Sequence, residues 1–270
     1  MLEPSPDASR TGALVVGNEI LLGRTKDTNT VFLAEQLFNR GLRLTRWVIV
    51  PDIEEDIARE LNRFITDNFG IVVVAGGMGP THDDITVPAV AKALYLPLEF
   101  NRECYNRMLK KWQSWNPGKT LPESGRRGLE KMAQVPRDFD LINNEEGMVE
   151  GLVGSGNKGK TLIFILPGVP REYKGIVGTY KFQDYLPKGD SRGIVFKEVL
   201  FRGKESQMAP FLEELQRKCP DIDIGSYPQG PWKVILRVTG PSESVEKAVM
   251  EIALEAEKLE EENREEFQRP

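Results

Sequence analysis

The chain has little of the chemistry that marks several common classes of protein. Its 270 residues include one histidine and two distant cysteines, Cys104 and Cys219, which form no CxxC pair and favour a reduced cytosolic protein over a disulfide scaffold. No apolar run approaches the ~20 residues that cross a bilayer, so we expect no membrane partner. The net charge of -5 argues against a nucleic-acid partner, which would need a basic face. Residues 1–7 (MLEPSPD) are unlike a secretory or mitochondrial leader, and we expect a cytoplasmic location.

The first part of the chain alternates strand and helix patterns. Residues 71–75 (IVVVA) are apolar at every position, which is typical of a central strand covered on both faces. The β-α-β-α-β-α order predicts a doubly wound, mostly parallel α/β sheet, whose ligands bind beyond the carboxyl ends of the strands. Expected strands are 13–16, 42–50 and 71–75, and expected helices are 28–40, 53–64 and 85–94.

From about residue 193 the pattern changes to a β-α-β-β-α order, which predicts a second, smaller α+β unit. Its expected strands are 194–201, 222–227 and 233–239, and its expected helices are 205–218 and 242–266. We therefore expect a disordered tail over 1–11, the α/β domain over 12–187 and the small domain over 188–270.

The most informative segment is 72–86 (VVVAGGMGPTHDDIT), in which an apolar strand runs into a glycine-rich turn. Glycines let the backbone approach a ligand closely, and a helix N-terminus offers N–H groups to phosphate oxygens. Asp83 and Asp84 are predicted to open that helix, beside the only histidine, His82. Two carboxylates would repel a bare phosphate, so they indicate a bridging cation. In the alternative interpretation the glycines only form a tight turn and Asp84 only caps the helix.

Three other segments are candidates for the same site. Asp27 precedes the first long helix and would also serve as its cap. Residues 167–174 (PGVPREYK) follow a strand and present charged side chains, or form a rigid turn with solvated charges. Ser226 follows a glycine in the second unit, where a simple turn explains it equally well.

The segment 154–161 (GSGNKGKT) matches two phosphate-loop patterns, G-x-x-x-x-G-K-T and G-x-G-x-x-G. Both require a helix after the loop. Here a short β-branched and aromatic run follows, closed by Pro167, so we predict a hairpin between strands 148–153 and 161–166.

The motifs together resemble one family. The chain is similar to the N-terminal domain of CinA and to the matching domain of eukaryotic FAD synthase, which belong to the molybdopterin-binding superfamily of MogA and MoaB. It departs from the usual pattern at Asn18 and Met78, neither of which removes a catalytic group. It ends where these relatives continue into amidase or adenylyltransferase domains, so we expect neither of those activities. The matching segments are 17–23 (GNEILLG), 27–29 (DTN), 76–86 (GGMGPTHDDIT), 166–172 (LPGVPRE), 203–206 (GKES) and 224–228 (IGSYP).

The resemblance implies metal-dependent hydrolysis of a nucleotide pyrophosphate, either FAD, giving FMN and AMP, or ADP-ribose. The divalent metal would be Mg, Mn or Co, and relatives form oligomers, which makes a homo-oligomer an expected state. A non-catalytic molybdopterin- or nucleotide-binding protein and a protein-interaction module remain as alternatives. The implied roles are metal binding by Asp84, Asp83 and Asp27, proton transfer by His82 or Glu172, substrate contacts from Gly76, Gly77, Gly79, Thr81, Gly168, Lys174 and Ser226, and support from Asn29 and Thr86.

Overall fold

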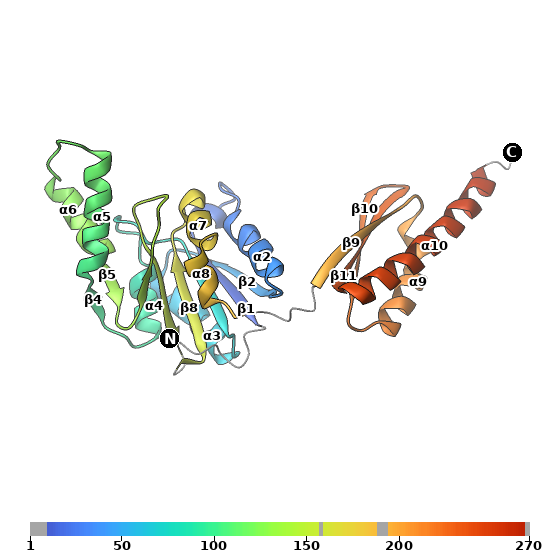
Figure 1. Cartoon of the computed structure of the whole chain (residues 1–270), viewed down its shortest axis with the longest axis horizontal. Coiled ribbons are helices and arrows are strands. Elements are labelled where there is room, and N and C mark those ends of the chain that lie inside the picture. The colour runs from blue at the N-terminus through green and yellow to red at the C-terminus, as the bar shows by residue number, and fades with distance from the viewer. Residues whose placement is uncertain (1–9, 157–158, 188–193, 268–270) are drawn as a thin grey trace. The chain divides into compact units, whose positions relative to one another are not determined.

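The computed structural model describes residues 10–156, 159–187 and 194–267, and Figure 1 shows the chain as a ribbon. The chain divides into two compact units, one before residue 190 and one from it onward, and each is described by itself. The predicted boundary after residue 187 adjoins residues that lie outside the described chain. Residues 1–9 of the predicted tail also lie outside it. Thr11 of that tail belongs to the fold, because the first strand begins there, and the Arg10 carbonyl accepts a hydrogen bond from Gly70 N at 3.1 Å.

The first unit is built on a six-stranded sheet in the order β2-β1-β3-β8-β7-β6. The first four strands are parallel, and β7 is antiparallel to both of its neighbours. The predicted α/β class with a mostly parallel sheet is therefore confirmed. The strands are β1 (Thr11–Val16), β2 (Leu44–Val50), β3 (Ile71–Ala75), β6 (Asp140–Ile142), β7 (Gly151–Gly156) and β8 (Thr161–Leu166).

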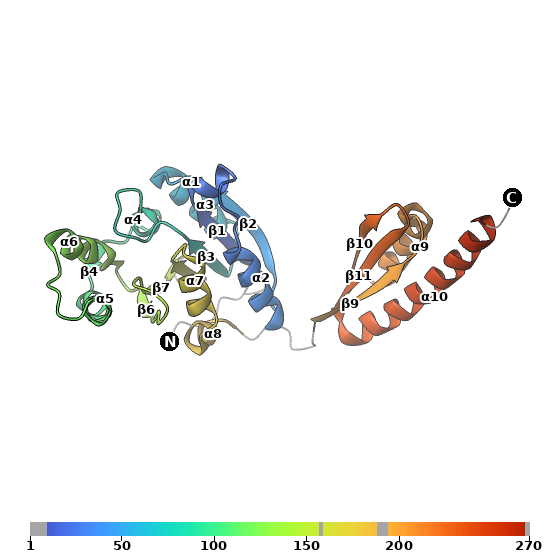
Figure 2. The same ribbon diagram turned by 90° about the horizontal axis from the view of Figure 1, so that it is seen from above.

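Helices cover both faces of this sheet, as Figures 1 and 2 show from two directions. The central strand β3 divides its side chains between two cores. Val72 and Val74 pack in the core that includes α3 and α4, whereas Val73 packs in the core that includes α2, α7 and α8. The continuous apolar run of the sequence is thus explained by burial on both faces. These helices are α2 (Asn29–Asn39), α3 (Glu54–Thr66), α4 (Thr86–Ala93), α7 (Pro170–Val177) and α8 (Tyr180–Tyr185), and a short α1 (Asn18–Leu21) follows β1.

Between α4 and β6 the chain forms an insertion outside the main sheet. It consists of β4 (Leu98–Phe100), α5 (Arg102–Trp115), α6 (Glu123–Met132) and β5 (Gln134–Pro136), with β4 and β5 paired antiparallel. The two helices lie next to each other in Figures 1 and 2. α5 ends at Trp115, directly before the sequence Asn-Pro-Gly, whose proline and glycine do not favour a continued helix.

The phosphate-loop match at 154–161 falls in a hairpin, as predicted. β7 and β8 pair antiparallel, with Gly154 opposite Ile163 and Gly156 opposite Thr161. A strand, not a helix, follows this loop, so its backbone lacks the helix N-terminus that both phosphate-binding mechanisms use. Residues 157–158 at its tip lie outside the described chain.

The second unit has a three-stranded antiparallel sheet in the order β10-β11-β9. Alternate residues of β11, including Val234, Leu236 and Val238, are buried against α9 and α10, which is the expected period of a strand with one covered face. The elements are β9 (Ile194–Phe201), α9 (Glu205–Lys218), β10 (Asp223–Gly230), β11 (Lys233–Pro241) and α10 (Ser242–Phe267), which confirms the predicted smaller α+β unit. Within the described chain, no helix is both long and apolar enough to cross a membrane.

A buried charged residue, Glu150, fastens the insertion to the sheet. Its side chain is fully buried, and its carboxylate accepts hydrogen bonds from Lys111 Nζ of α5 at 2.7 Å and from Asn144 N at 3.1 Å. Lys111 Nζ also donates to the Asn144 carbonyl at 2.5 Å. β6 and β8 run in the same direction, so the connection that follows β6, residues 143–150, lies at the edge of the sheet where β8 ends. The hydrogen bonds of Glu150 and Lys111 hold this connection against α5.

We expect Glu150→Ala to destabilise the protein by about 3 kcal/mol, because removing one partner of a buried ion pair leaves the other charge unpaired. Lys111 retains 19% exposure, which keeps the expected loss at the lower end of the range for such pairs. Urea denaturation measures the change. Glu146→Ala is the matched control, because Glu146 lies in the same connection but pairs on the surface with Arg171, and it should cost under about 1 kcal/mol. Equal losses in the two variants would contradict the assigned role of Glu150.

Candidate functional site

The glycine turn after β3 lies where three backbone segments meet. Gly76 and Gly77 have φ of 101° and 60°, which side chains other than glycine rarely adopt. A Cβ on Gly76 would lie 2.2 Å from the Val16 carbonyl oxygen, and one on Gly168 would lie 3.2 Å from Gly76 Cα. The crevice between β1 and β3 is also the point where the strand order reverses, which is the usual ligand position in such sheets.

The N–H groups of this turn are only partly available to a ligand. Gly76 N donates to the Leu166 carbonyl at 3.0 Å, so its amide is already used. Among the described residues, the amides of Gly77 and Gly79 have no such partner. The Met78 side chain between them is buried in the core and anchors the turn. Of the three predicted glycine amides, two remain suitable for phosphate contacts.

Asp83 and Asp84 do not open a helix, contrary to the sequence prediction. α4 begins at Thr86, and Ile85 precedes it without a capping side chain. Asp84 instead closes its own turn, since its Oδ2 accepts a hydrogen bond from Thr81 N at 2.9 Å. The capping interpretation of Asp84 was therefore wrong, because the four-residue turn from Thr81 to Asp84 supplies the hydrogen bond to this carboxylate.

The Thr81 hydroxyl holds the two carboxylates together. Its oxygen lies 2.5 Å from Asp83 Oδ1 and 2.5 Å from Asp84 Oδ2, but it has a single hydrogen to donate. This hydroxyl and the backbone N–H of Asp83 lower the pKa of Asp83, and nearby His82 and Lys131 contribute in the same direction. The acid turn, Thr81 to Asp84, thus concentrates negative charge beside the glycines.

Asp27 and Asn29 reach the same region from the start of α2. Asp27 Oδ1 accepts hydrogen bonds from Asn29 N and Thr30 N, both at 3.0 Å, so the predicted capping role is present. Asn29 Nδ2 donates to the Gly168 carbonyl at 2.8 Å. Because Gly168 packs on Gly76, these contacts join the α2 end of the site to the glycine turn.

Three buried polar atoms around this turn have no hydrogen-bond partner among the described residues: Asp27 Oδ2, Asn29 Oδ1 and Thr86 Oγ1. Thr86 lies directly against the turn, because a Cβ on Gly77 would stand 2.4 Å from its hydroxyl. Buried polar groups are almost always paired in native proteins. Single unpaired hydroxyls also occur at Thr11 and Thr161, but here three oxygen atoms come from neighbouring residues.

Glu172 lies in a different environment from the one predicted for a proton carrier. It accepts a hydrogen bond from Asn144 Nδ2 at 3.2 Å and others from the Met148 and Val149 backbone, and it packs on Gly147. Partial burial raises the pKa of Glu172 and outweighs these bonds, which act to lower it. Its contacts connect α7 to the 143–150 connection, which indicates a structural role.

Two further predicted residues have contacts that modify their assigned roles. The Lys174 ammonium lies over the Phe32 ring of α2, 5.5 Å from its centroid. His82 is exposed beside Asp83, so it remains accessible for proton transfer.

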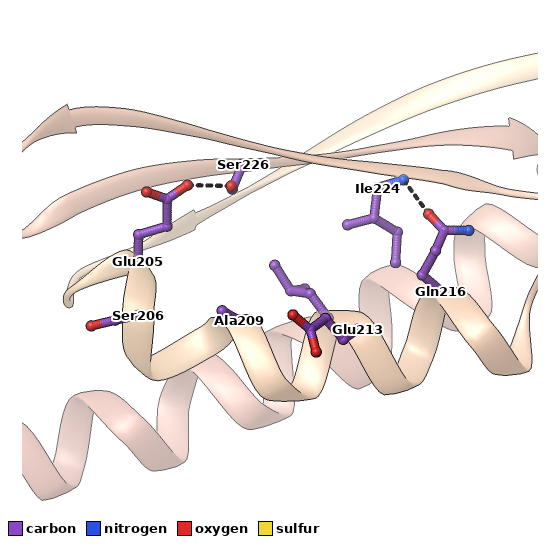
Figure 3. A pocket seen from close by; sticks show the side chains of 8 residues that line it. Glu205, Ser206, Ala209, Glu213, Gln216, Ile224 and Ser226 are labelled. Carbon is purple, nitrogen blue, oxygen red and sulfur yellow. Dashed lines mark hydrogen bonds between the residues drawn. The ribbon is translucent and has the colours of Figure 1, made fainter.

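Ser226 belongs to the second unit. Its hydroxyl donates to Glu205 Oε1 at the end of a hollow of about 590 Å³ between α9 and β10, shown in Figure 3. Gln216 closes the other end, where its Oε1 accepts a hydrogen bond from Ile224 N at 3.0 Å. The structure thus gives Ser226 a local partner in its own unit.

The three predicted metal ligands do not gather into one cluster. Across the described ranges, no group of three or more His, Cys, Asp or Glu side chains is arranged to hold a metal ion. Asp83 and Asp84 form a pair, and Asp27 is attached to α2 instead. Sequence reasoning also missed Lys131, which donates from α6 to the Thr81 carbonyl across 50 residues of chain. No local motif signals that contact.

Comparison with known proteins finds a matching family for each of the two units. Residues 12–184 match the family described as a probable molybdopterin binding domain, and residues 193–263 match the FAD synthase middle domain. A protein of Pyrococcus abyssi is 34% identical over 88% of this chain and 93% of its own. One from Pyrobaculum arsenaticum is 36% identical over 80% of this chain and 78% of its own.

A solved structure matches the first unit. It is the protein CinA of Thermoplasma acidophilum, which is described as having unknown function and is 31% identical in sequence. The match has a TM-score of 0.56 and covers 65% of this chain and 97% of the CinA chain. The glycine turn, the acid turn and the α2 start all lie within the matched family region. The chain therefore belongs to the molybdopterin-binding domain family, with a CinA-like first unit followed by a unit of the FAD synthase middle-domain type.

Proposed function

We propose that the protein binds a nucleotide diphosphate, FAD or ADP-ribose, at the glycine turn and hydrolyses its P–O–P link. The observation that carries this proposal is the set of unpaired buried oxygens on Asp27, Asn29 and Thr86. Leaving such groups unpaired costs stability, so their gathering beside a glycine turn points to a ligand that satisfies them. Sugar hydroxyls or a hydrated cation supply the donors that these acceptors need.

Different residues of the chain contact the phosphates and carry the proton. The free amides of Gly77 and Gly79 contact diphosphate oxygens, and the missing Cβ atoms let the backbone come close. Water adds across one P–O bond, and the bridging oxygen leaves with the other phosphate, so that FAD gives FMN and AMP. His82 is the exposed group beside the acid turn that is suited to carry the proton.

The acid turn fits a divalent cation. Thr81 donates to both carboxylates through its hydroxyl and its backbone N–H, but these neutral donors leave the two negative charges of Asp83 and Asp84 uncancelled. Mg²⁺ is commonly held by one or two carboxylates together with substrate phosphates and waters, which explains how a pair can suffice. When bound, the ion would neutralise phosphate charge and lower the pKa of a water.

The second candidate is a protein that binds a nucleotide or a molybdopterin without turnover. The description of the matched family favours it. The same orphan oxygens and glycine amides would serve such a ligand, and only product formation separates the two functions.

Asp84→Asn should abolish most turnover while leaving the fold intact. Loss of a residue that merely supports a metal ligand costs about 10–100-fold, so loss of the ligand should lower kcat at least about 100-fold. AMP release from FAD and from ADP-ribose is followed by chromatography with Mg, Mn or Co and with a chelator. Asp56→Asn, which changes a partly exposed carboxylate of α3 that pairs with Arg59, is the control and should retain activity. Metal-independent release, or an active Asp84→Asn, would contradict the mechanism. Nucleotide binding without release would favour the second candidate.

Thr86→Val should keep or raise the free energy of unfolding, because it removes a buried hydroxyl that has no partner. The same change should weaken ADP-ribose binding about 3- to 10-fold, the worth of one hydrogen bond. Urea denaturation and calorimetric titration measure the two quantities.

Thr161→Val provides the matched control for this variant. Its hydroxyl is also buried and unpaired, but it lies at the start of β8, at the opposite edge of the sheet. It should change stability in the same direction and leave binding unchanged. If Thr86→Val is destabilising and binds ADP-ribose normally, the hydroxyl has an internal role.

A further inference from the structure

A positively charged part of the insertion adjoins the acid turn. Lys174, expected to screen phosphate charge, lies over the Phe32 ring, whereas the cations of α6 adjoin the acid turn. α6 carries Arg126, Arg127 and Lys131 against two acids, in a chain whose net charge is -5. It is therefore locally cationic next to a site for an anionic ligand.

Two contacts fix α6 on the turn. Gly128 lies against Pro80, and a Cβ at this glycine would come within 3.0 Å of the Pro80 Cβ. One helical turn later, Lys131 donates to the Thr81 carbonyl. The position of α6 relative to Asp83 and Asp84 is thus set by direct contact.

Beside these contacts lies a hollow of about 560 Å³, which we call the α6 hollow. Pro80, which directly precedes the acid turn, lies on one side of the hollow, and residues of α6 form the rest of its lining. Its lining residues are Pro80, Glu123, Ser124, Arg127, Gly128 and Lys131.

Arg127 can turn toward a ligand at little cost. Its side chain is 76% exposed, and its Nε lies 3.2 Å from Glu123 Oε1. Glu123 is also bound by Arg126, whose Nη2 and Nε lie 2.7 and 3.1 Å from Oε2. If Arg127 leaves, Glu123 therefore keeps an ion-pair partner.

We propose that the α6 hollow is a phosphate subsite, in which Arg127 binds a phosphate of the nucleotide held at the glycine turn. This rests on the proposed function and deepens it by naming the group that receives the substrate's negative charge. A planar guanidinium matches two phosphate oxygens at once, and the Ser124 hydroxyl and Lys131 supply further donors. The acid turn and the α6 hollow then hold opposite charges side by side, as a metal–diphosphate complex requires.

The test compares Arg127→Gln with Arg126→Gln. Both variants remove one charge from the same helix and an ion pair with Glu123, which has two hydrogen bonds from Arg126 and one from Arg127, but only Arg127 lines the hollow. Binding of ADP, and separately of inorganic pyrophosphate, is titrated by calorimetry with Mg²⁺ at low and high salt. Melting temperatures confirm that both variants fold.

Arg127→Gln should raise the Kd of ADP about tenfold or more and reduce the salt dependence of binding, since a charge-assisted contact is lost. Arg126→Gln should stay within about twofold of the unmodified protein. Equal effects of the two substitutions, normal binding by Arg127→Gln, or no binding of either probe by the unmodified protein would each overturn the proposal. ADP binding that depends on Arg127, without cleavage of FAD or ADP-ribose, would support the subsite and contradict the hydrolase.

Discussion

The site depends on how closely three backbone segments approach one another at the carboxyl edge of the sheet. Gly76 lies so near the Val16 carbonyl and Gly168 that no side chain fits between them. This contact, together with the Gly76–Leu166 hydrogen bond, joins the ends of β1, β3 and β8. Asn29 is tied to this contact through the Gly168 carbonyl and Thr86 through Gly77, so the residues with unpaired buried oxygens surround the same turn.

Much of the fold follows from local patterns in the sequence. The apolar run of β3, the helical spacing of α2 and α3 and the change of order after residue 193 each depend on nearest neighbours along the chain. The hairpin at β7 and β8 could be predicted for the same reason, because β-branched residues follow its loop. The glycine turn after β3 could also be predicted, and the positive φ of Gly76 and Gly77 explains why glycine is needed there.

The roles of individual polar residues were harder to predict from the sequence, because their partners lie far away along the chain. Glu172 is bound by a connection more than twenty residues before it, and Lys131 reaches across fifty residues to Thr81. Asp84 illustrates a different failure. A carboxylate before a helix is a good cap, but a competing turn within the same five residues satisfies it first.

The insertion begins and ends at one small strand pair, β4 with β5, and stands outside the main sheet. It nevertheless contacts the acid turn through α6 and the sheet edge through Lys111. Substitutions along the outer side of α6 therefore alter the surroundings of the acid turn without passing through the strands that build it. In evolutionary terms, the acid turn and the helix that borders it are encoded in separate stretches of the chain and can diverge independently within one fold.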